Sequence, residues 1–406
     1  MNVIFLTVSR MNDIRSRGIY TDLMRKFRDE GHHVYIVAPV ERRYRQITSL
    51  KEEAGIHILQ VKTLNIQKTN VIEKGLGIIC LEKQFKKAIQ ESFKNICFDL
   101  ILYSTPPITL NKVITFLKHQ NPQAVCYLLL KDIFPQNAVD LGMFSQHSLF
   151  YKIFRKKEIQ LYQNSDFIGC MSPANVDFIL KHNSFLSKEQ VEVAPNSLDL
   201  LDNAVEVNRN EIRRKYQLPI DKPIFIYGGN LGKPQGIDFV IKCLEKNKER
   251  TDCHFLIVGN GTEYSKLACW CEKAHAKSVS LLKGLPKEDY DKLVQSCDVG
   301  LIFLDHRFQI PNYPSRLLSY LEYKMPVIAA TDIHTDIGSI AEKNGYGYWC
   351  ESINPDDFTA CVSRFVEHPD RIISMGEKGY QFLLDNYLIK YTYQAIIKHL
   401  QCIKMV

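Results

Sequence analysis

The stretch Ile310–Thr331, IPNYPSRLLSYLEYKMPVIAAT, decides how the fold of this chain is interpreted. A loop with two prolines leads into a helix that is predicted to begin near Pro314-Ser315, and Lys324-Met325-Pro326 ends it before a buried strand. A loop that enters a helix N-terminus gathers unpaired backbone N–H groups, which can hold an anion. Arg316, in the first turn, would then be a partner for a bound phosphate. A proline-capped helix packed on a sheet, with Arg316 in solvent, explains the same pattern, so both interpretations stay open.

The length of the chain indicates two domains. It has 406 residues, of which 45% are hydrophobic, so it can bury sizeable cores, and single cores rarely grow beyond about 250–300 residues. No run approaches the roughly 18 consecutive apolar residues that span a bilayer. The start, Met1–Ser9, has only a short apolar run and no basic region before it. We therefore expect a first buried strand there rather than a signal peptide.

The twelve cysteines are scattered singly, often inside apolar runs. Because no secretion signal is predicted, we interpret them as reduced, buried side chains of a cytoplasmic protein. Cys269 and Cys271 form one cluster, with Cys253, His254 and His275 nearby in the sequence. This arrangement lacks the paired spacing of structural zinc sites, so we expect no metal and no cofactor.

The formal net charge of +7 comes without a basic tail of the kind that binds nucleic acid, so no nucleic-acid partner is expected. Basic side chains nevertheless gather in two places in the first half of the chain. The candidates for contact with an anionic membrane are Arg42, Arg43, Arg45, Lys152, Arg155, Lys156 and Lys157. Phe150, Tyr151 and Phe154 accompany the second group, which is consistent either with a solvated face or with peripheral docking on the inner face of the cell membrane.

The order of apolar segments predicts an α/β protein. Short β-branched runs alternate with amphipathic stretches, as in βα units whose parallel sheet is covered on both faces. The helices predicted in the first half include Leu81–Asn95, Leu149–Gln163 and Pro173–His182. The pattern loosens around Val191–Asn203 and then restarts, so we expect two Rossmann-like, doubly wound domains that face a central cleft. These domains are predicted at 1–200 and 206–386, and an amphipathic helix at about 387–406 is expected to pack back on the first.

A glycine-rich turn follows the first predicted strand of the second half. The segment Gly228–Gly236 leaves that strand and enters a helix, so its backbone could approach a phosphate closely. Its spacing matches neither the dinucleotide-binding fingerprint nor a Walker loop. Lys233 and the distant Arg316 would together supply two cations for one diphosphate. A second turn of this kind, Gly259–Gly261, follows the next predicted strand.

Several short motifs together resemble a known family. They are Arg17-Gly18, Glu30-Gly31-His32-His33-Val34, Pro195-Asn196-Ser197, Tyr227-Gly228-Gly229-Asn230-Leu231-Gly232, Val258-Gly259-Asn260-Gly261, Ser296-Cys297-Asp298-Val299-Gly300 and Pro314-Ser315-Arg316-Leu317-Leu318. With these motifs the chain resembles, over nearly its whole length, a GT-B glycosyltransferase of the retaining glycosyltransferase family 4. It is most similar to the branch that builds bacterial O-antigen and capsule chains. The resemblance implies a GT-B fold and the transfer of a hexosyl or N-acetylhexosaminyl group from a nucleotide-sugar, with a UDP-sugar favoured, to a lipid-linked oligosaccharide acceptor.

The resemblance also implies roles for individual residues. Lys233 and Arg316 would hold the diphosphate from two sides and act in catalysis. The implied donor-binding residues are Gly18, Gly229, Asn230, Gly232, Gln235, Gly259, Asn260, Gly261, Gly284, Leu285, Pro286, Ser315, Ser319 and Glu322. The implied acceptor-side turn consists of Ser104, Thr105, Pro106 and Pro107.

The chain departs from the family at a pair of glutamates that usually approach the sugar and the ribose. Counting back from Pro326 places Pro311 and Ser319 at those positions, so both carboxylates are missing. Glu322, about one helical turn after Ser319, is the expected substitute at the ribose, and a surface position is the alternative. Asn230 and Gln235 replace two cations of the family, which leaves Lys233 as the one cation expected in that turn.

The proposed chemistry follows from charge. Breaking a glycosyl–phosphate bond develops negative charge on the phosphate, which backbone N–H groups, Lys233 and Arg316 are suited to stabilise. Family resemblance implies retention of configuration, with the leaving phosphate helping to deprotonate the acceptor. Asp132, at a predicted strand end, is the candidate for positioning or deprotonating the acceptor hydroxyl, and helix capping is its alternative role. Two other functions stay open, namely a GT-B nucleotide-sugar epimerase and a catalytically inactive scaffold for another transferase.

Overall fold

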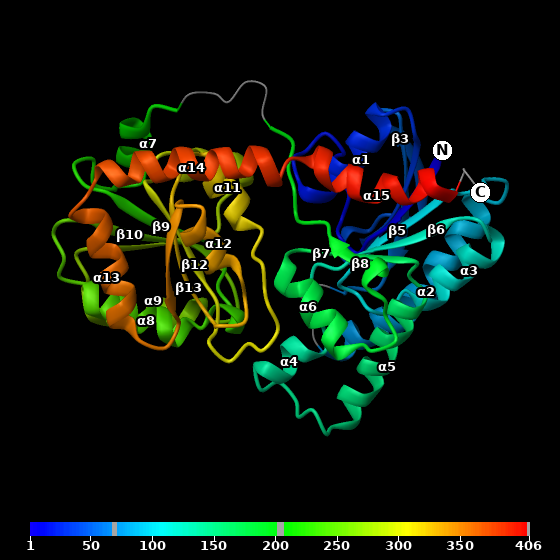
Figure 1. The fold of residues 1–406 in the computed structure, drawn as a ribbon, viewed down its shortest axis with the longest axis horizontal. Coiled ribbons are helices and arrows are strands. Elements are labelled where there is room, and N and C mark those ends of the chain that lie inside the picture. Colours follow the sequence, from blue (N-terminus) through cyan, green and yellow to red (C-terminus); the bar gives the residue numbers. More distant parts are fainter. Residues whose placement is uncertain (67–70, 201–206, 404–406) are drawn as a thin grey trace. The chain divides into compact units, whose positions relative to one another are not determined.

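The computed structural model describes residues 1–66, 71–200 and 207–403 of the chain (Figure 1). It divides into two compact units, one formed by Met1–Asp199 with Leu388–Val406 and the other by Leu200–Tyr387. The boundary that we expect between 200 and 206, and the last residues of the expected C-terminal helix, lie outside the described residues.

The first unit is built on one mixed sheet, whose described strands run in the order β3-β4-β2-β1-β5-β6-β7-β8. The strands are β1 (Asn2–Leu6), β2 (His33–Glu41), β3 (Ser49–Glu53), β4 (Ile56–Thr63), β5 (Leu100–Ser104), β6 (Val125–Leu129), β7 (Phe167–Cys170) and β8 (Val191–Val193). The helices are α1 (Ile19–Asp29), α2 (Val71–Ser92), α3 (Asn111–Gln120), α4 (Gln136–Asp140), α5 (Leu149–Gln163), α6 (Pro173–His182) and α15 (Ile389–Ile403). Strand β1 pairs in parallel with both β2 and β5, so the strand order reverses there.

Helices cover both faces of this sheet (Figure 1). On one face α1 packs against α15, and on the other α3 packs between α2 and α5. The inward residues of β1, Val3 and Phe5, are fully buried against apolar side chains of both α1 and α15, among them Phe27 and Ile396. The C-terminal helix therefore completes the core of the unit that contains the N-terminus.

The second unit is built on a parallel sheet, whose described strands run in the order β11-β10-β9-β12-β13-β14. The strands are β9 (Ile224–Asn230), β10 (His254–Asn260), β11 (Val279–Lys283), β12 (Val299–Phe303), β13 (Val327–Thr331) and β14 (Gly347–Glu351). The helices are α7 (Arg209–Lys215), α8 (Ile237–Asn247), α9 (Tyr264–Ala274), α10 (Lys287–Gln295), α11 (Arg316–Glu322), α12 (Ile337–Lys343), α13 (Pro355–Val366) and α14 (Asp370–Asn386). The strand order reverses at β9, which pairs with both β10 and β12.

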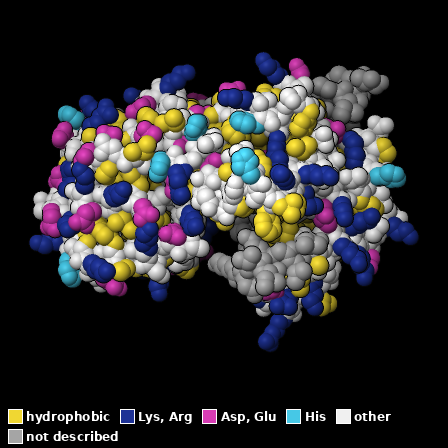
Figure 2. Space-filling view, turned by 90° about the horizontal axis from the view of Figure 1, so that it is seen from below, with side chains coloured by type: hydrophobic (Ala, Val, Ile, Leu, Met, Phe, Trp, Pro, Cys, Tyr) yellow, Lys and Arg dark blue, Asp and Glu magenta, His cyan; other side chains and the backbone are white. Residues whose placement is uncertain are grey.

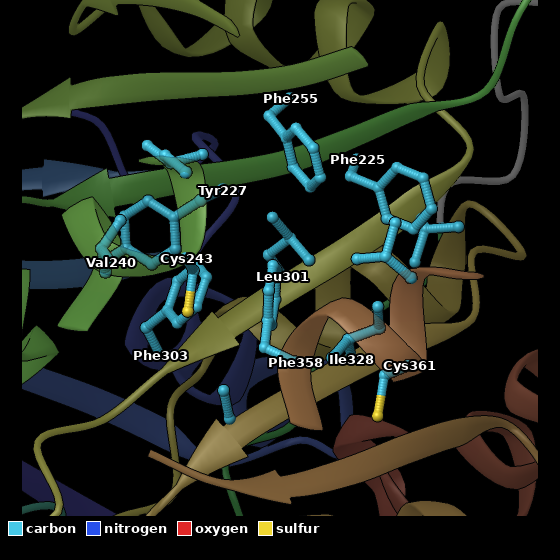
Figure 3. Close-up of a cluster of buried hydrophobic side chains, with 14 of the residues drawn as sticks. Phe225, Tyr227, Val240, Cys243, Phe255, Leu301, Phe303, Ile328, Phe358 and Cys361 are labelled. Carbon is cyan, nitrogen blue, oxygen red and sulfur yellow. The ribbon is translucent and has the colours of Figure 1, made fainter. Parts of the chain in front are cut away.

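The core of the second unit lies between the sheet and the helices α8 and α13. Figure 3 shows Phe225, Leu301 and Phe358 among its buried side chains, which come from β9, β12 and α13. These strands are apolar on both faces, as expected for a parallel sheet that is covered on each side. The predicted α/β class with two doubly wound, Rossmann-like units is confirmed.

Three details of the predicted elements are wrong. Helix α2 begins at Val71, although the sequence places its start at Leu81. Gly77 lowers the helix propensity of this segment, but a Cβ added to it would lie 2.7 Å from Cγ2 of Ile66, so close packing requires the glycine. Strand β9 continues through Gly228 to Asn230, which the sequence assigns to a loop. The sequence also misses three strands, β3, β8 and β14.

Candidate active site

The glycine-rich segment Gly228–Gly236, which covers the end of β9 and the turn after it, lies where the strand order of the second sheet reverses, the usual position of a ligand site in such sheets. Its backbone packs directly on that of the neighbouring turn after β10. A Cβ added to Gly259 would lie 1.9 Å from the Gly229 carbonyl oxygen, and one added to Gly261 would lie 2.1 Å from that of Leu231. The Leu231 N–H also donates to the Asn260 carbonyl at 2.9 Å. Close approach of the two backbones is therefore what demands glycine at these positions.

Asn260 extends this contact to a third turn. Its side-chain oxygen accepts a hydrogen bond of 3.3 Å from the Gly284 N–H, at the end of β11. A Cβ added to Gly284 would lie 2.4 Å from Nδ2 of Asn260. The structure thus brings together the three turns that the sequence assigns to the donor, which include Leu285 and Pro286, along the carboxyl edge of β9, β10 and β11.

Arg316 reaches the first of these turns from α11. Its guanidinium lies over the Tyr227 ring, 4.1 Å from the centroid, and Nη1 donates to the Gly228 carbonyl at 2.8 Å. A Cβ added to Gly229, whose φ is +135°, would lie 3.1 Å from Nη2. Burial disfavours the charge, but the nearby phenol groups of Tyr227 and Tyr320 outweigh it and raise the pKa of Arg316. A fixed, permanently charged guanidinium therefore adjoins the backbone of the glycine turn.

Two further tyrosines, Tyr320 and Tyr290, pack against Gly228 in the same turn, and neither was predicted from the sequence. The Tyr320 hydroxyl accepts from the Gly228 N–H at 3.3 Å and donates to the Ile226 carbonyl at 3.2 Å. A Cβ added to Gly228 would lie 1.8 Å from the Tyr290 hydroxyl. Burial raises the pKa of Tyr290 to about 12, so it stays neutral. Tyr320 lies one helical turn after Arg316, a spacing that could have indicated a shared face.

Gln235 and Lys233, the other polar residues expected to bind the donor in this turn, differ in their exposure to solvent. The side-chain oxygen of Gln235 is used inside the turn, where it accepts from the Gly232 N–H at 3.2 Å and from Nδ2 of Asn230 at 3.1 Å. Gln235 is buried, whereas Lys233 is exposed. The structure therefore brings Arg316 onto the turn, and Lys233 faces solvent from a short 3-10 segment beside it.

The other donor-binding residues expected around Arg316 lie on or just before α11. Ser315 is its exposed N-cap and forms no capping hydrogen bond through its side chain. Ser319 and Glu322 are both half-buried in the helix. The preceding loop is tied to the glycine turn, because the Asp305 N–H donates to the Pro234 carbonyl at 3.0 Å. Arg307 pairs with the Asp305 carboxylate at 2.8 Å, so this acid is already compensated.

The first unit brings the expected acceptor-side residues together at the carboxyl ends of β5 and β6. Ser104 and Thr105 are buried, Pro106 is exposed and Pro107 is half-buried. The Thr105 hydroxyl accepts from the Lys131 N–H at 2.9 Å, and its Oγ1 lies 3.2 Å from the backbone nitrogen of Asp132. Thr105 thereby links the proline turn to the strand end that carries Asp132.

The Asn137 amide group contacts the whole Asp132 carboxylate. Nδ2 of Asn137 donates to both carboxylate oxygens, at 2.8 and 2.9 Å. Burial raises the pKa of Asp132 to about 6, the range in which a carboxylate can exchange protons near neutral pH. Its neighbour Lys131 donates to the Ala194 carbonyl at 3.0 Å, and burial lowers its pKa to about 7. Sequence reasoning missed Lys131, since only burial distinguishes it from a surface lysine.

Gly18 is the N-cap residue of α1 and ends the loop that follows β1. Its N–H donates to the buried Asp22 carboxylate at 3.0 Å, and its φ of 175° is extended backbone that any residue can adopt. Packing there is only moderately tight, because an added Cβ would lie 3.2 Å from Oγ1 of Thr21. Among the described residues, no helix is long and apolar enough to cross a membrane.

Known proteins share this architecture. Residues 208–382 match the family model described as "Glycosyl transferases group 1". The protein named "Probable glycosyltransferase WbjE", from Pseudomonas aeruginosa, is 22% identical over 316 residues, which cover 75% of this chain and 74% of WbjE. The crystal structure of WaaG, a glycosyltransferase involved in lipopolysaccharide biosynthesis, has a TM-score of 0.66 at 12% identity and covers 97% of this chain and 98% of its own.

A further solved structure holds a nucleotide. HepE from Anabaena, in complex with UDP, has a TM-score of 0.68 at 13% identity, and the match covers 99% of this chain and all (100%) of HepE. The two sheets, with the glycine turn at the reversal of the second, define a GT-B protein. Residues 208–382 of the second unit therefore match the group 1 glycosyl transferases, and the chain as a whole is a glycosyltransferase that resembles retaining family 4.

Proposed function

We propose that this chain transfers a hexosyl or N-acetylhexosaminyl group from a nucleotide-sugar to a lipid-linked oligosaccharide during synthesis of a surface polysaccharide. The observation that carries the proposal is the Arg316 guanidinium fixed over Tyr227 beside the exposed Gly229 backbone. A planar cation next to a glycine turn suits a diphosphate. The UDP in the HepE structure favours a UDP-sugar, and the role of WaaG in lipopolysaccharide synthesis favours a surface glycan.

In this proposal Arg316 stabilises the negative charge that develops on the leaving diphosphate. Lys233, exposed on the same turn, adds a second cation. The glycosyl–phosphate bond breaks, the acceptor oxygen forms a bond to the same face of the sugar, and configuration is retained. The acceptor proton passes either to the leaving phosphate, while the Asp132 carboxylate positions the hydroxyl, or to Asp132 itself. Glu322 binds the ribose, and Ser319, at the position of one of the two missing carboxylates, contributes to donor binding.

We also propose that the first unit contacts the inner face of the membrane, where a lipid-linked acceptor is held. Around α5 four large apolar side chains are exposed, namely Met143, Leu149, Phe150 and Ile153. Exposed lysines accompany them, and Figure 2 shows hydrophobic side chains beside Lys and Arg side chains on this unit. Apolar side chains flanked by lysine suit an anionic leaflet.

The structure reduces the number of basic residues that are available for the proposed contact with the membrane. Arg42 pairs with Glu73 at 2.8 Å, Arg43 with Glu41 at 2.8 Å, and Arg155 with Glu158 at 2.6 Å. These three guanidiniums are therefore already compensated. Arg45, Lys152 and Lys156 are exposed, and Lys157 is half-buried, so the proposed contact depends mainly on these side chains.

Thermal unfolding in the presence of nucleotides tests the donor site. UDP, GDP and their sugars should be compared with AMP and NAD, because a ligand that binds only the folded state raises the unfolding temperature. One nucleoside diphosphate should stabilise the protein, and Arg316→Ala should abolish the shift. Arg364→Ala is the matched control, since Arg364 lies over the Tyr348 ring at 4.0 Å in the same unit. A shift that survives in Arg316→Ala would refute the proposed site.

Product analysis separates the other two functions. A transferase releases nucleoside diphosphate only when an acceptor is present. An epimerase would convert the nucleotide-sugar without an acceptor, and a scaffold would make no product with any acceptor. Conversion of the nucleotide-sugar without an acceptor would therefore support the epimerase. The absence of product with lipid-linked oligosaccharides from several surface polysaccharides would support the scaffold.

A further inference from the structure

A separate hollow of about 750 Å³ lies on the helical face of the first unit, between α2, α3 and α5. These helices lie side by side in Figure 1. Its lining includes Lys86 from α2, Lys112 and His119 from α3, and Gln160 from α5. We name it the α2–α3–α5 groove. None of the donor-side or acceptor-side residues discussed above lines it.

The groove carries uncompensated positive charge. Its described lining residues include no aspartate and no glutamate. Elsewhere on α3 a lysine is paired, since Nζ of Lys118 lies 3.0 Å from the Asp166 carboxylate. Glu82 accepts from the Lys112 backbone N–H at 2.7 Å in the first turn of α3, but it is buried and is not among the described lining residues. Lys86 and Lys112 are both exposed, so their ammonium groups are accessible to an anion.

The amide groups of the groove indicate a sugar rather than a bare anion. Gln120, Gln160 and Gln163 are exposed, and their side chains form no hydrogen bond within the described part of the chain. Each amide both donates and accepts, which suits hydroxyl groups. By contrast, the Asn111 amide is used internally, donating to the Lys157 carbonyl at 3.0 Å and accepting from Asn164 at 3.2 Å.

Two other ligand chemistries fit less well. Phosphate is best held by arginine forks or by clustered backbone N–H groups, and the described lining of the groove contains no arginine. A nucleic-acid base requires an open aromatic face. The described lining residues include two aromatic rings, those of Phe116 and His119, and the Lys86 ammonium already lies over the larger ring of Phe116, 4.7 Å from the centroid. Carboxylated sugars match both the lysines and the amides.

The groove begins near the proposed acceptor turn. Helix α3 starts at Asn111, four residues after Pro107, and the groove follows this helix to Gln120. With 10 residues, α3 is about 15 Å long, enough for an oligosaccharide rather than a single sugar. We propose that the α2–α3–α5 groove binds a uronic-acid-containing segment of the acceptor glycan. That the segment belongs to the acceptor rests on the proposed function.

Direct binding to the full chain tests this proposal without a donor. Isothermal titration calorimetry should compare tetragalacturonic acid with the neutral maltotetraose at low and high salt. We expect the acidic tetrasaccharide to bind more tightly, and its affinity to fall as salt screens the charges. Lys86→Gln combined with Lys112→Gln should weaken it about tenfold. Lys94→Gln combined with Lys181→Gln removes the same charge at exposed positions outside the groove and should change it less than about twofold.

Several results would overturn the proposal. These are no binding of tetragalacturonic acid, equal affinity for maltotetraose, equal weakening by both double variants, or displacement of the acidic sugar by anionic vesicles or polyuridylate with the same dependence on Lys86 and Lys112. The donor site can be followed separately. Stabilisation by UDP should persist in the Lys86→Gln, Lys112→Gln variant, and tetragalacturonate binding should persist in Arg316→Ala. Loss of one signal without the other therefore identifies which proposal fails.

Discussion

At the scale of single residues, Arg316 is the side chain on which the proposed transfer depends most. Arg316→Ala should lower kcat/KM by an amount equivalent to about 2–4 kcal/mol, because the charge that develops on the diphosphate loses its partner. Arg364→Ala, which uncovers Tyr348 instead of Tyr227, should keep its activity and lose similar stability. Activity of Arg316→Ala within a factor of about two of the wild type would contradict the phosphate site.

Asp132 should give the reaction a pH dependence. Because its pKa is raised to about 6 and only the carboxylate accepts a proton, kcat/KM should rise as pH increases through about 6 and then level off. Asp132→Asn should lower the rate by about 10²–10⁴-fold and remove this limb. Asp332→Asn is the control, since burial raises the pKa of Asp332 to about 6 as well, but at the end of β13. A limb that persists in Asp132→Asn would exclude Asp132 as the base.

The same carboxyl group should affect stability in the opposite direction. Its pKa rises from 3.8 to about 6 on folding, so the folded state binds the proton more tightly than the unfolded chain. The contribution of protonated Asp132 to the free energy of unfolding is therefore complete below about pH 4 and is lost as pH rises to about 6. Unfolding curves of Asp132→Asn against the wild type should show the variant gaining relative stability across this interval. A constant difference would mean that Asp132 is not buried as described.

Gly228 tests the packing under the proposed site. A Cβ there would lie 1.8 Å from the Tyr290 hydroxyl, so Gly228→Ala should destabilise the second unit by about 1–3 kcal/mol. Combining it with Tyr290→Ala should cost less than the sum of the two single changes, because the second change removes the clash. Urea unfolding of the four proteins measures this coupling. Strictly additive losses would show that Tyr290 and Gly228 do not pack as described.

At the scale of elements, the core of the first unit depends on α15, which lies at the other end of the chain. Ile396 is fully buried in the first core, and the Thr392 hydroxyl donates to the Pro195 carbonyl at 3.0 Å. Ile396→Ala should cost about 2–5 kcal/mol, and exposed Lys390→Ala should cost little. Calorimetry should show the loss in the transition of the first unit, while UDP still stabilises the second. Equal effects of both variants would mean that α15 contributes little to that core.

Elements with strong local patterns could be predicted from the sequence, and short strands that depend on a neighbouring strand could not. Leu149–Gln163 and Pro173–His182 are helices with the predicted bounds, and both have serine N-caps that accept backbone hydrogen bonds. By contrast, β8 has 3 residues, and β3 is the antiparallel edge strand beside β4. Such strands form because a neighbouring strand offers hydrogen bonds, which a local pattern does not show.

At the scale of the whole molecule, the glycine turns could be placed from the sequence because glycine marks close backbone approach. The proposed role of Arg316 came from its position in the first turn of a helix and from a family resemblance, and the structure adds its contact with Tyr227. Neither Tyr290 nor Lys131 could be predicted as part of the site. Tyr290 meets Gly228 from a different helix, and the lowered pKa of Lys131 results from burial by distant segments. Contacts of this kind depend on tertiary packing, which spacing along the chain does not encode.

The whole molecule also supports a prediction about membranes. Its net charge is +7, and apolar side chains around α5 are exposed, with Leu149 at 71% and Phe150 at 67% of their full surface. We expect cosedimentation with vesicles that contain anionic phospholipid, weaker binding to neutral vesicles, and release by salt. Leu149→Ser combined with Phe150→Ser should abolish most of this binding, because inserted apolar area contributes about 25 cal/mol per Å².

Ile373→Ser is the matched control, since Ile373 is 73% exposed but lies on α14 in the other unit. It should leave vesicle binding unchanged. Lys152→Gln with Lys156→Gln should reduce binding to anionic vesicles alone, by about 1 kcal/mol per lysine. If the serine variant of α5 bound as well as the Ile373 control, the apolar face of α5 would not insert, and the exposed side chains would have to serve a protein partner instead. Because UDP stabilisation does not involve α5, it should be the same in all of these variants and would show that each is folded.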